Sequence, residues 1–304
     1  MPSASEINDV QAFHRWLAAV AEETRENFGP DDKLGTANYI DPIARLRGAA
    51  CMSSGEAVNL ARPLVEGPGF HVEISSDPAG ICAMDQVEAS CHGHAKTHID
   101  ALNHLAHAGK FYGGRTLQDP KLPSVVELAG HSLFTRAVVA DITEVRGTPW
   151  VAADKPVTDA DIDLALEGVQ VLPGDALVLY MGRDRWEAAG RSMAHNADGG
   201  QSDLDGGRQA GAGRLAAKWI LEHKISILAW DFLDSFDDPD APGDAKGTVH
   251  RLLPAAGLIL IDNCDLGRAA AMMRNAGRRT AAFVTQPLAI PGGTGSLVTP
   301  WLYL

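Results

Sequence analysis

A chain of 304 residues with 45% hydrophobic and 21% charged residues has the composition of a folded globular protein. Because a chain of this length buries about 75% of its unfolded surface, its composition excludes a fibrous, disordered or disulfide-stapled protein. The 26 basic and 39 acidic residues give a formal net charge of −13, which repels nucleic acid phosphates and anionic lipids. We therefore expect a small-molecule substrate, with neither nucleic acid nor a membrane as a partner.

The sequence shows no export or membrane-insertion pattern. Its first nine residues are acidic where a secretion signal is basic and then apolar, and its apolar runs fall short of the roughly 18 residues of a membrane span. A cytoplasmic location is therefore expected. The four cysteines contain no CxxC pair, which predicts buried reduced thiols rather than disulfides or a zinc ribbon. They are Cys51, Cys82, Cys91 and Cys264.

The first predicted element is an amphipathic helix between Ile7 and Phe28, where apolar residues recur at intervals of three and four. Residues 28–42 are dense in Gly, Pro and Asp and predict a structured loop. We assign residues 1–50 to a helical arm with this loop, and residues 51–304 to a single domain. The apolar stripe of the arm needs a partner surface, in the same chain or in a second copy.

The rest of the chain predicts an α/β fold. Short segments between Val58 and Cys91 suit strands and are separated by Gly and Pro, which predicts hairpins or a meander. Four apolar runs of strand length then alternate with helical or loop stretches, as in an α/β layer. These runs are residues 133–142, 176–182, 225–231 and 258–262, and a helix at 215–223 leads into the third. The acidic segment 231–247 predicts a solvated loop.

Five of the eleven histidines lie within sixteen residues: His92, His94, His98, His104 and His107. Imidazole and carboxylate are ligands of Zn²⁺ and Mn²⁺, and a catalytic site uses about three of them. His94, His98 and Asp100 supply that number. If Thr97 caps a helix, Asp100 and His104 share one face, which places His104 near a metal-bound water as the catalytic residue. The alternative is a helix rich in surface histidines.

Other residues have a less certain place in this site. His92 and His107 either support the ligands or are exposed. Asp262 ends the apolar run 258–262, and α/β sites are often built at strand ends. Asp231 ends the preceding run and is a candidate to lie behind the ligands. His250 lies in an amphipathic stretch and, from its residue type alone, is equally compatible with an ordinary structural role.

Residues 94–104, HAKTHIDALNH, resemble the HxGTHxDxPxH signature of the metal-dependent cyclase superfamily that includes bacterial kynurenine formamidase and isatin hydrolase. The His, Thr and Asp positions match, whereas Lys96 replaces Gly and Leu102 replaces Pro. The resemblance extends over most of the chain, because residues 28–42, 249–266 and 286–301 are similar to further stretches of longer members.

This resemblance implies a mixed β-sheet core of the swivelling β/β/α type, a Zn²⁺ or Mn²⁺ cofactor, and a homodimer or higher homo-oligomer. In members with two ions, a His and a Glu twelve residues later hold the second ion. His250 and Asp262 have that spacing, with Asp replacing Glu. The shorter carboxylate and the positive charge of Lys96 favour one tightly bound ion, with any second ion weak.

The implied activity is hydrolysis of an amide, an aryl formamide or a cyclic amide. A bound ion polarises the carbonyl and lowers the pKa of water to about 7, and His104 then serves as general base and acid. Lactone hydrolysis, or cyclase or dehydratase chemistry on the same scaffold, is the alternative. A protein that binds metal without turnover also stays open, with the Lys96 ammonium occupying the site.

Two glycine-rich motifs point to other functions. GAGRLA at residues 211–216 satisfies the dinucleotide pattern GxGxxA, which would indicate a nicotinamide oxidoreductase. That pattern needs a strand before it, and the preceding stretch is polar, so we interpret it as a flexible lead into a helix. GGTGS at 292–296 lacks the Lys of a phosphate loop and predicts a tight turn or the lip of a pocket.

Overall fold

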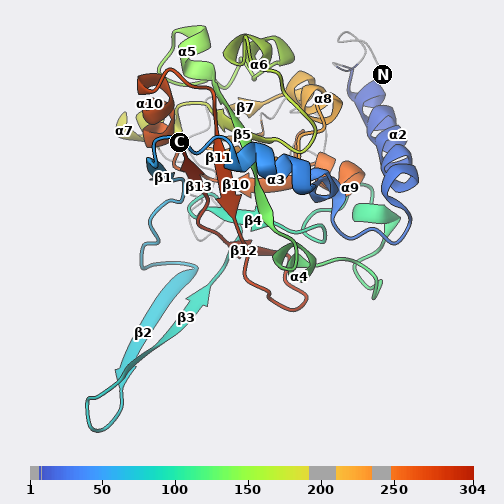
Figure 1. The fold of residues 1–304 in the computed structure, drawn as a ribbon. Helices are drawn as coiled ribbons and strands as arrows, with labels where there is room; N and C mark the ends of the chain where they lie inside the picture. Colours follow the sequence, from blue (N-terminus) through green and yellow to red (C-terminus); the bar gives the residue numbers. More distant parts are fainter. Residues whose placement is uncertain (1–6, 8, 192–209, 235–247) are drawn as a thin grey trace.

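Nine strands form one mixed sheet in the order β1-β13-β11-β5-β6-β8-β10-β4-β12, with helices packed around it (Figure 1). The computed structural model describes residues 7, 9–191, 210–234 and 248–304. The α/β fold with a mixed sheet, expected from the sequence, is confirmed. Within the described ranges, none of the helices has the length and apolar character needed to cross a bilayer.

The four predicted apolar runs form the parallel centre of the sheet. They are β5 (Leu133–Asp141), β6 (Ala176–Tyr180), β8 (Ile227–Trp230) and β10 (Ile259–Asp262), paired in that order. Every residue of β6, β8 and β10 is buried. Strands covered on both faces read as continuous apolar runs, which is why the sequence identified them.

Antiparallel strands complete the sheet on both sides. On one side lie β11 (Thr280–Thr285), β13 (Trp301–Tyr303) and β1 (Ala57–Asn59), and on the other lie β4 (His98–Asp100) and β12 (Gly295–Leu297). Strand β4 lies between β10 and β12, with Asp262 opposite His98 and Gly295 opposite Asp100. This register brings the histidine motif and the strand-end Asp262 together.

The predicted N-terminal helix is present as α2 (Val10–Phe28), capped by Asp9. It buries Phe13, Leu17 and Val20 and packs against α9 (Leu252–Ala256) and η2 (Tyr112–Gly114). The partner surface of the arm therefore belongs to the same chain.

The remaining helices are shorter. They are η1 (Gly35–Tyr39), α3 (Pro42–Ala49), α4 (Val125–Ala129), α5 (Ile142–Arg146), α6 (Asp159–Ala165), α7 (Arg183–Ala188), α8 (Arg214–Glu222) and α10 (Gly267–Asn275). Helix α8 confirms the predicted helix at 215–223.

Strands β2 (Phe70–Ser76) and β3 (Ala83–Ala89) form a separate hairpin that projects away from the sheet (Figure 1). The sequence predicted this hairpin but not its exposure. The prediction of buried thiols holds for Cys51 and Cys264, and it is wrong for Cys82, which is exposed beside β3, and for the half-buried Cys91. Both thiols lie on or next to a hairpin that no other described element covers.

Two predictions around residues 211–234 need correction. Gly211–Ala212 form strand β7, paired with β9 (Leu233–Asp234), and a Cβ at Gly211 would lie 2.0 Å from the carbonyl oxygen of Leu233. The GAGRLA stretch is therefore tightly packed rather than a flexible lead. Asp231 and Asp234 are buried rather than solvated, and residues 235–247 of the acidic segment lie outside the described residues.

Candidate metal centre

Strand β4 positions two of the predicted ligands. The prediction that Thr97 caps a helix is wrong, because His98–Asp100 are strand residues paired on both sides. Alternate side chains of a strand share a face, so His98 and Asp100 point the same way. Thr97 instead donates to the carbonyl of Asn263 at 2.7 Å and accepts the backbone N–H of Arg62 at 2.9 Å.

Among the described residues, two groups of side chains have donor atoms close enough to hold a metal ion. They are His92, His98 and Asp100, and Asp100, His250 and Asp262, and within each group the donor atoms lie within 4.8 Å of one another. The structure therefore brings together four of the five ligands proposed from the sequence. Because the groups share Asp100, its carboxylate would supply a ligand atom to each group if both held an ion.

The Asp100 carboxylate is the centre of this cluster. It is fully buried, and neither oxygen makes a hydrogen bond within the part of the chain that the structure describes. Four imidazole nitrogens surround it: His92 Nδ1 at 3.1 Å, His98 Nε2 at 3.5 Å, His250 Nε2 at 3.7 Å and His104 Nε2 at 3.8 Å. An unsatisfied buried carboxylate is costly unless a cation or donors compensate it. These residues fit a divalent cation that accepts nitrogen and oxygen ligands.

His250 and Asp262 form the second half of the cluster. His250 Nε2 lies 3.0 Å from Asp262 Oδ2, and Asp262 Oδ1 accepts the indole N–H of Trp230 at 2.6 Å. Burial alone lowers the pKa of His250, but the carboxylates of Asp234 and Asp262 raise it well above its ordinary value. Burial conversely raises the pKa of Asp262, and His250 holds it well below its ordinary value. The shorter Asp therefore still reaches His250.

His104 lies at the more open side of the cluster. Its backbone N–H donates to the carbonyl of Ala101 at 2.9 Å, so a turn after β4 returns the ring toward Asp100. The ring stacks on His92 with centroids 3.7 Å apart, and the side chain is 27% exposed. Burial lowers the pKa of His104, and Asp100 offsets part of that shift. The geometry allows His104 to meet both solvent and the cluster.

The structure places His92, rather than His94, with His98 and Asp100. The second ring nitrogen of His92, Nε2, lies 2.9 Å from Thr294 Oγ1. Thr294 belongs to the glycine-rich stretch 292–296, which therefore borders the candidate metal centre. The role of His94 as a ligand stays a prediction.

A buried network holds the loop that carries these histidines. Arg183 donates to the carbonyl of His94 at 2.5 Å and to Asn263 Oδ1 at 2.7 Å. Asn263 in turn donates to the carbonyls of Gly93 at 2.6 Å and Lys96 at 3.2 Å. Neither Arg183 nor Asn263 was recognised from the sequence, because only the fold brings them to this loop.

Asp231 acts on the same network from behind. Its carboxylate accepts the backbone N–H groups of Met181, Gly182, Arg183 and Phe232 at 2.9 to 3.0 Å. Burial raises its pKa to about 6, although these bonds act in the opposite direction. Asp231 thus fixes the start of α7 and, through it, Arg183.

Two further residues of the motif region lie near the cluster without joining it. His107 Nδ1 accepts a hydrogen bond from Nη1 of Arg251 at 3.0 Å. Lys96 extends toward the root of the hairpin, where its Nζ would lie 3.2 Å from a Cβ built on Gly69. Its ammonium therefore lies at the hairpin root, which differs from the expectation that it enters the metal site.

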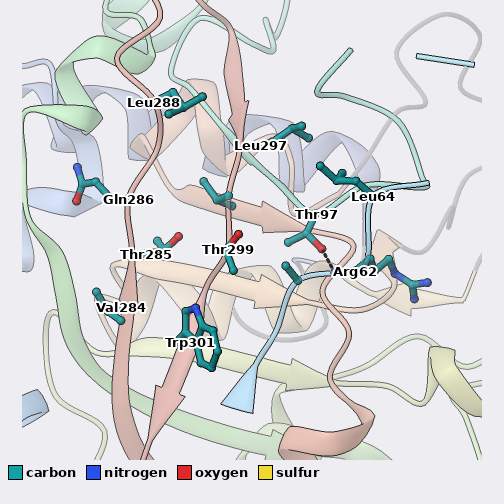
Figure 2. Close-up of a pocket in the computed structure, with 12 residues that line it drawn as sticks. Arg62, Leu64, Thr97, Val284, Thr285, Gln286, Leu288, Leu297, Thr299 and Trp301 are labelled. Atoms are coloured by element: carbon teal, nitrogen blue, oxygen red, sulfur yellow. Dashed lines mark hydrogen bonds between the residues drawn. The ribbon is translucent and has the colours of Figure 1, made fainter. Parts of the chain in front are cut away.

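A separate cavity of about 440 Å³ is lined in part by residues of β11, β12 and β13. Figure 2 shows Thr97 in its wall, together with Leu64, Leu288 and Trp301. None of the residues that surround Asp100 lines it. Because the cavity shares no lining residue with the two ligand groups, this mainly apolar cavity and the candidate metal centre are distinct.

Comparison with known proteins defines the class. Residues 35–237, more than half of the chain, match the family model described as "Putative cyclase". The chain belongs to this cyclase family, which confirms the family resemblance of its histidine motif. No curated protein matches the chain.

Several solved structures share the fold. A crystal structure described as a novel cyclase is 22% identical, with a TM-score of 0.73, over 91% of this chain and 98% of that chain. Isatin hydrolase A from Labrenzia aggregata, bound to benzyl benzoate, is 19% identical, with a TM-score of 0.57, over 81% and 93%. Isatin hydrolase A from Ralstonia solanacearum is 17% identical, with a TM-score of 0.56, over 81% and 91%. At these identities the likeness shows the fold.

Proposed function

We propose that this protein is a metal-dependent hydrolase that cleaves the C–N bond of an amide, an aryl formamide or a cyclic amide. The observation that carries the proposal is the buried Asp100 carboxylate, which makes no hydrogen bond with the described residues and is surrounded by four imidazoles. Membership of the cyclase family and a fold shared with two isatin hydrolases support it.

The donor set supports Zn²⁺ or Mn²⁺ as the cofactor, because both ions accept imidazole and carboxylate ligands. His98, Asp100, His250 and Asp262 would hold it, together with His92 or His94. The bound ion would act as a Lewis acid toward the substrate carbonyl and would lower the pKa of water. The shared Asp100 allows two ions, and the sequence-based preference for one tight site remains part of the proposal.

The chain itself supplies the proton transfers. His104 accepts a proton from water as the water oxygen bonds to the carbonyl carbon. When the C–N bond breaks, His104 returns that proton to the leaving nitrogen, so the net reaction consumes one water and yields a carboxylic acid and an amine. The partial exposure of His104 lets it exchange with solvent between turnovers.

The proposal is tested with the metal-free protein reloaded with Zn²⁺ or Mn²⁺. We expect the protein to hydrolyse isatin or an aryl formamide only after it has been loaded with the metal ion. The change in substrate absorbance measures the hydrolysis. His104→Ala should remove most of the turnover, whereas His71→Ala, at an exposed hairpin histidine, should leave turnover unchanged. Turnover of lactones alone would replace the C–N assignment, and tight metal binding without turnover of any amide or lactone would contradict the enzyme.

A further inference from the structure

Asp234 contacts the metal centre from outside it. It ends strand β9, next to the sheet and 28 residues before Asp262, and it is buried. Its Oδ2 is in short contact with Nδ1 of His250, and its Oδ1 accepts the backbone N–H groups of Val249 and His250, the latter at 3.2 Å. One carboxylate thus holds both the backbone and the ring of His250.

This contact determines which ring nitrogen faces the ligand cluster. With Nδ1 directed at Asp234, Nε2 of His250 lies 3.0 Å from Asp262 Oδ2 and 3.7 Å from Asp100 Oδ2. A neutral imidazole has one N–H donor and one lone pair, and the hydrogen bond made by one nitrogen decides which nitrogen can bind a metal. An Nδ1–H directed at Asp234 leaves the lone pair of Nε2 for an ion.

We propose that Asp234 is a positioning residue that fixes His250 as a metal ligand through Nε2. The proposal rests on the proposed function, because it assumes that His250 binds the ion. Carboxylates that hold ligand histidines in this way commonly change metal affinity 10- to 100-fold when they are lost.

The nearby carboxylate of Asp231 has different hydrogen-bond partners from that of Asp234. Asp231 is also buried, but its oxygens are occupied by backbone N–H groups and contact no ligand of the cluster. Asp234 instead directs one carboxylate oxygen at the imidazole of His250. Two carboxylates three residues apart therefore differ in what they hold, and only Asp234 acts on a ligand side chain.

The test replaces Asp234 by Asn, which keeps the size of the side chain and an acceptor for the backbone N–H groups. The new amide can donate to Nδ1, which places the ring proton on Nε2 and removes the lone pair from the cluster. We expect Zn²⁺ affinity, measured by titration of the metal-free protein, to fall about 10- to 100-fold. Asp234→Glu, which keeps the charge, should retain more affinity than Asp234→Asn.

Asp163→Asn is the matched control. Asp163 does not belong to the cluster, and its carboxylate accepts the indole N–H of Trp219 with a distance of 2.7 Å between the two atoms. It should bind Zn²⁺ as the unaltered protein does. Equal Zn²⁺ affinity of the unaltered protein and Asp234→Asn would overturn the inference and leave the proposed function standing. Absence of Zn²⁺ binding by the unaltered protein would overturn both.

A second measurement needs no change at Asp234 and covers the case in which Asp234→Asn fails to fold. The ring nitrogens of His250 in the Zn²⁺-loaded protein are assigned by ¹⁵N NMR, with His250→Gln to identify its signals. A proton on Nδ1 and zinc on Nε2 are expected. Zinc on Nδ1 would overturn the inference, because Nδ1 would then be turned away from Asp234.

Discussion

Strand β4 and the hairpin β2–β3 are close in sequence, joined by residues 90–97, but their environments are opposite. All three residues of β4 are buried, although two of them are polar, whereas every residue of β3 is exposed, although it includes Met84 and Val87. Strand β4 has a strand on each side, and the hairpin has none beyond its own two. Burial here follows the pairing partners and not the local composition.

This contrast distinguishes polar residues that are buried for a functional reason from apolar residues whose exposure affects only stability. Burying Asp100 costs free energy that hydrogen bonds with the described residues do not offset, because neither of its carboxylate oxygens has a partner among them. A bound cation of the kind proposed above would offset that cost. The hairpin bears no such cost, and its apolar side chains lose only the stabilisation that burial would give.

The largest effect is expected at the buried strand. His98→Ala or Asp100→Ala should remove the metal ion and abolish hydrolysis, because each residue supplies a donor atom to a group of only three. Elemental analysis after dialysis measures the metal, and His71→Ala in the hairpin serves as the control. A full metal complement in either variant would show that other groups hold the ion.

His104 should separate metal binding from turnover. His104→Ala is expected to keep the ion and to lower kcat by about 10²- to 10⁴-fold, because the residue moves protons and its nitrogen is the most distant of the four around Asp100. Steady-state kinetics and metal content are measured on the same sample. If metal and activity disappear together, His104 is a ligand.

The sequence predicted the parts of the centre that are local. The spacing of His98, Asp100 and His104 in one stretch, and a resemblance for His250 and Asp262, indicated these residues before any fold was known. The prediction of a helix for this motif was wrong, because the spacing of residues along the chain does not reveal that β10 and β12 pair with a strand of only three residues.

The supporting residues could not be predicted for the same reason. Asp234 contacts His250, and Asn263 holds the loop of the histidines, only because the fold brings distant segments together, and neither belongs to a spacing pattern with the histidines. Thr294, which contacts His92, lies in the glycine-rich stretch that was predicted as a tight turn or pocket lip. The acidic composition of 231–247 even pointed away from Asp234, since such segments are usually solvated. The four central strands were predictable because a strand that is buried on both faces has a continuous run of apolar residues in the sequence.

His92 and His94 test how far the local motif decides the ligands. From the structure we expect His92→Ala to lower Zn²⁺ affinity more than His94→Ala does, because His92 Nδ1 lies 3.1 Å from Asp100 Oδ1. The family motif instead predicts that His94→Ala has the larger effect. Parallel zinc titrations of both variants decide, and a larger loss for His94→Ala would mean that the loop rearranges when the ion binds.

Core packing should show the same contrast in stability. Ile99, fully buried in β4, should cost about 2–5 kcal/mol in the free energy of unfolding when replaced by Ala. Ile74 in β2 is 74% exposed in the single chain, so at protein concentrations where the chain is a monomer its replacement should change the free energy of unfolding by no more than about 0.5 kcal/mol. Denaturant unfolding measures both. A loss of several kcal/mol for Ile74→Ala in the monomer would show that Ile74 is packed within its own chain.

The last expectation concerns the covering of the hairpin. Val72 and Val87 face each other across the hairpin on the same side as Ile74, and two strands alone are marginally stable in water. The chain also carries a mainly apolar cavity lined by Leu64 and Leu288. A second copy therefore offers an apolar surface to the hairpin, and a two-fold axis would let each copy cover the hairpin of the other.

We therefore expect light scattering at micromolar concentration to give a particle of two chains or more, each of 32.2 kDa. Ile74→Asp should reduce it to a single chain, because a charge would enter the apolar contact. Ser75→Asp, which places the same charge on the opposite face of β2, should leave the particle unchanged. A single-chain mass for the unaltered protein would mean that the hairpin stays uncovered, and the contrast with β4 would then hold in solution as it does in the isolated chain.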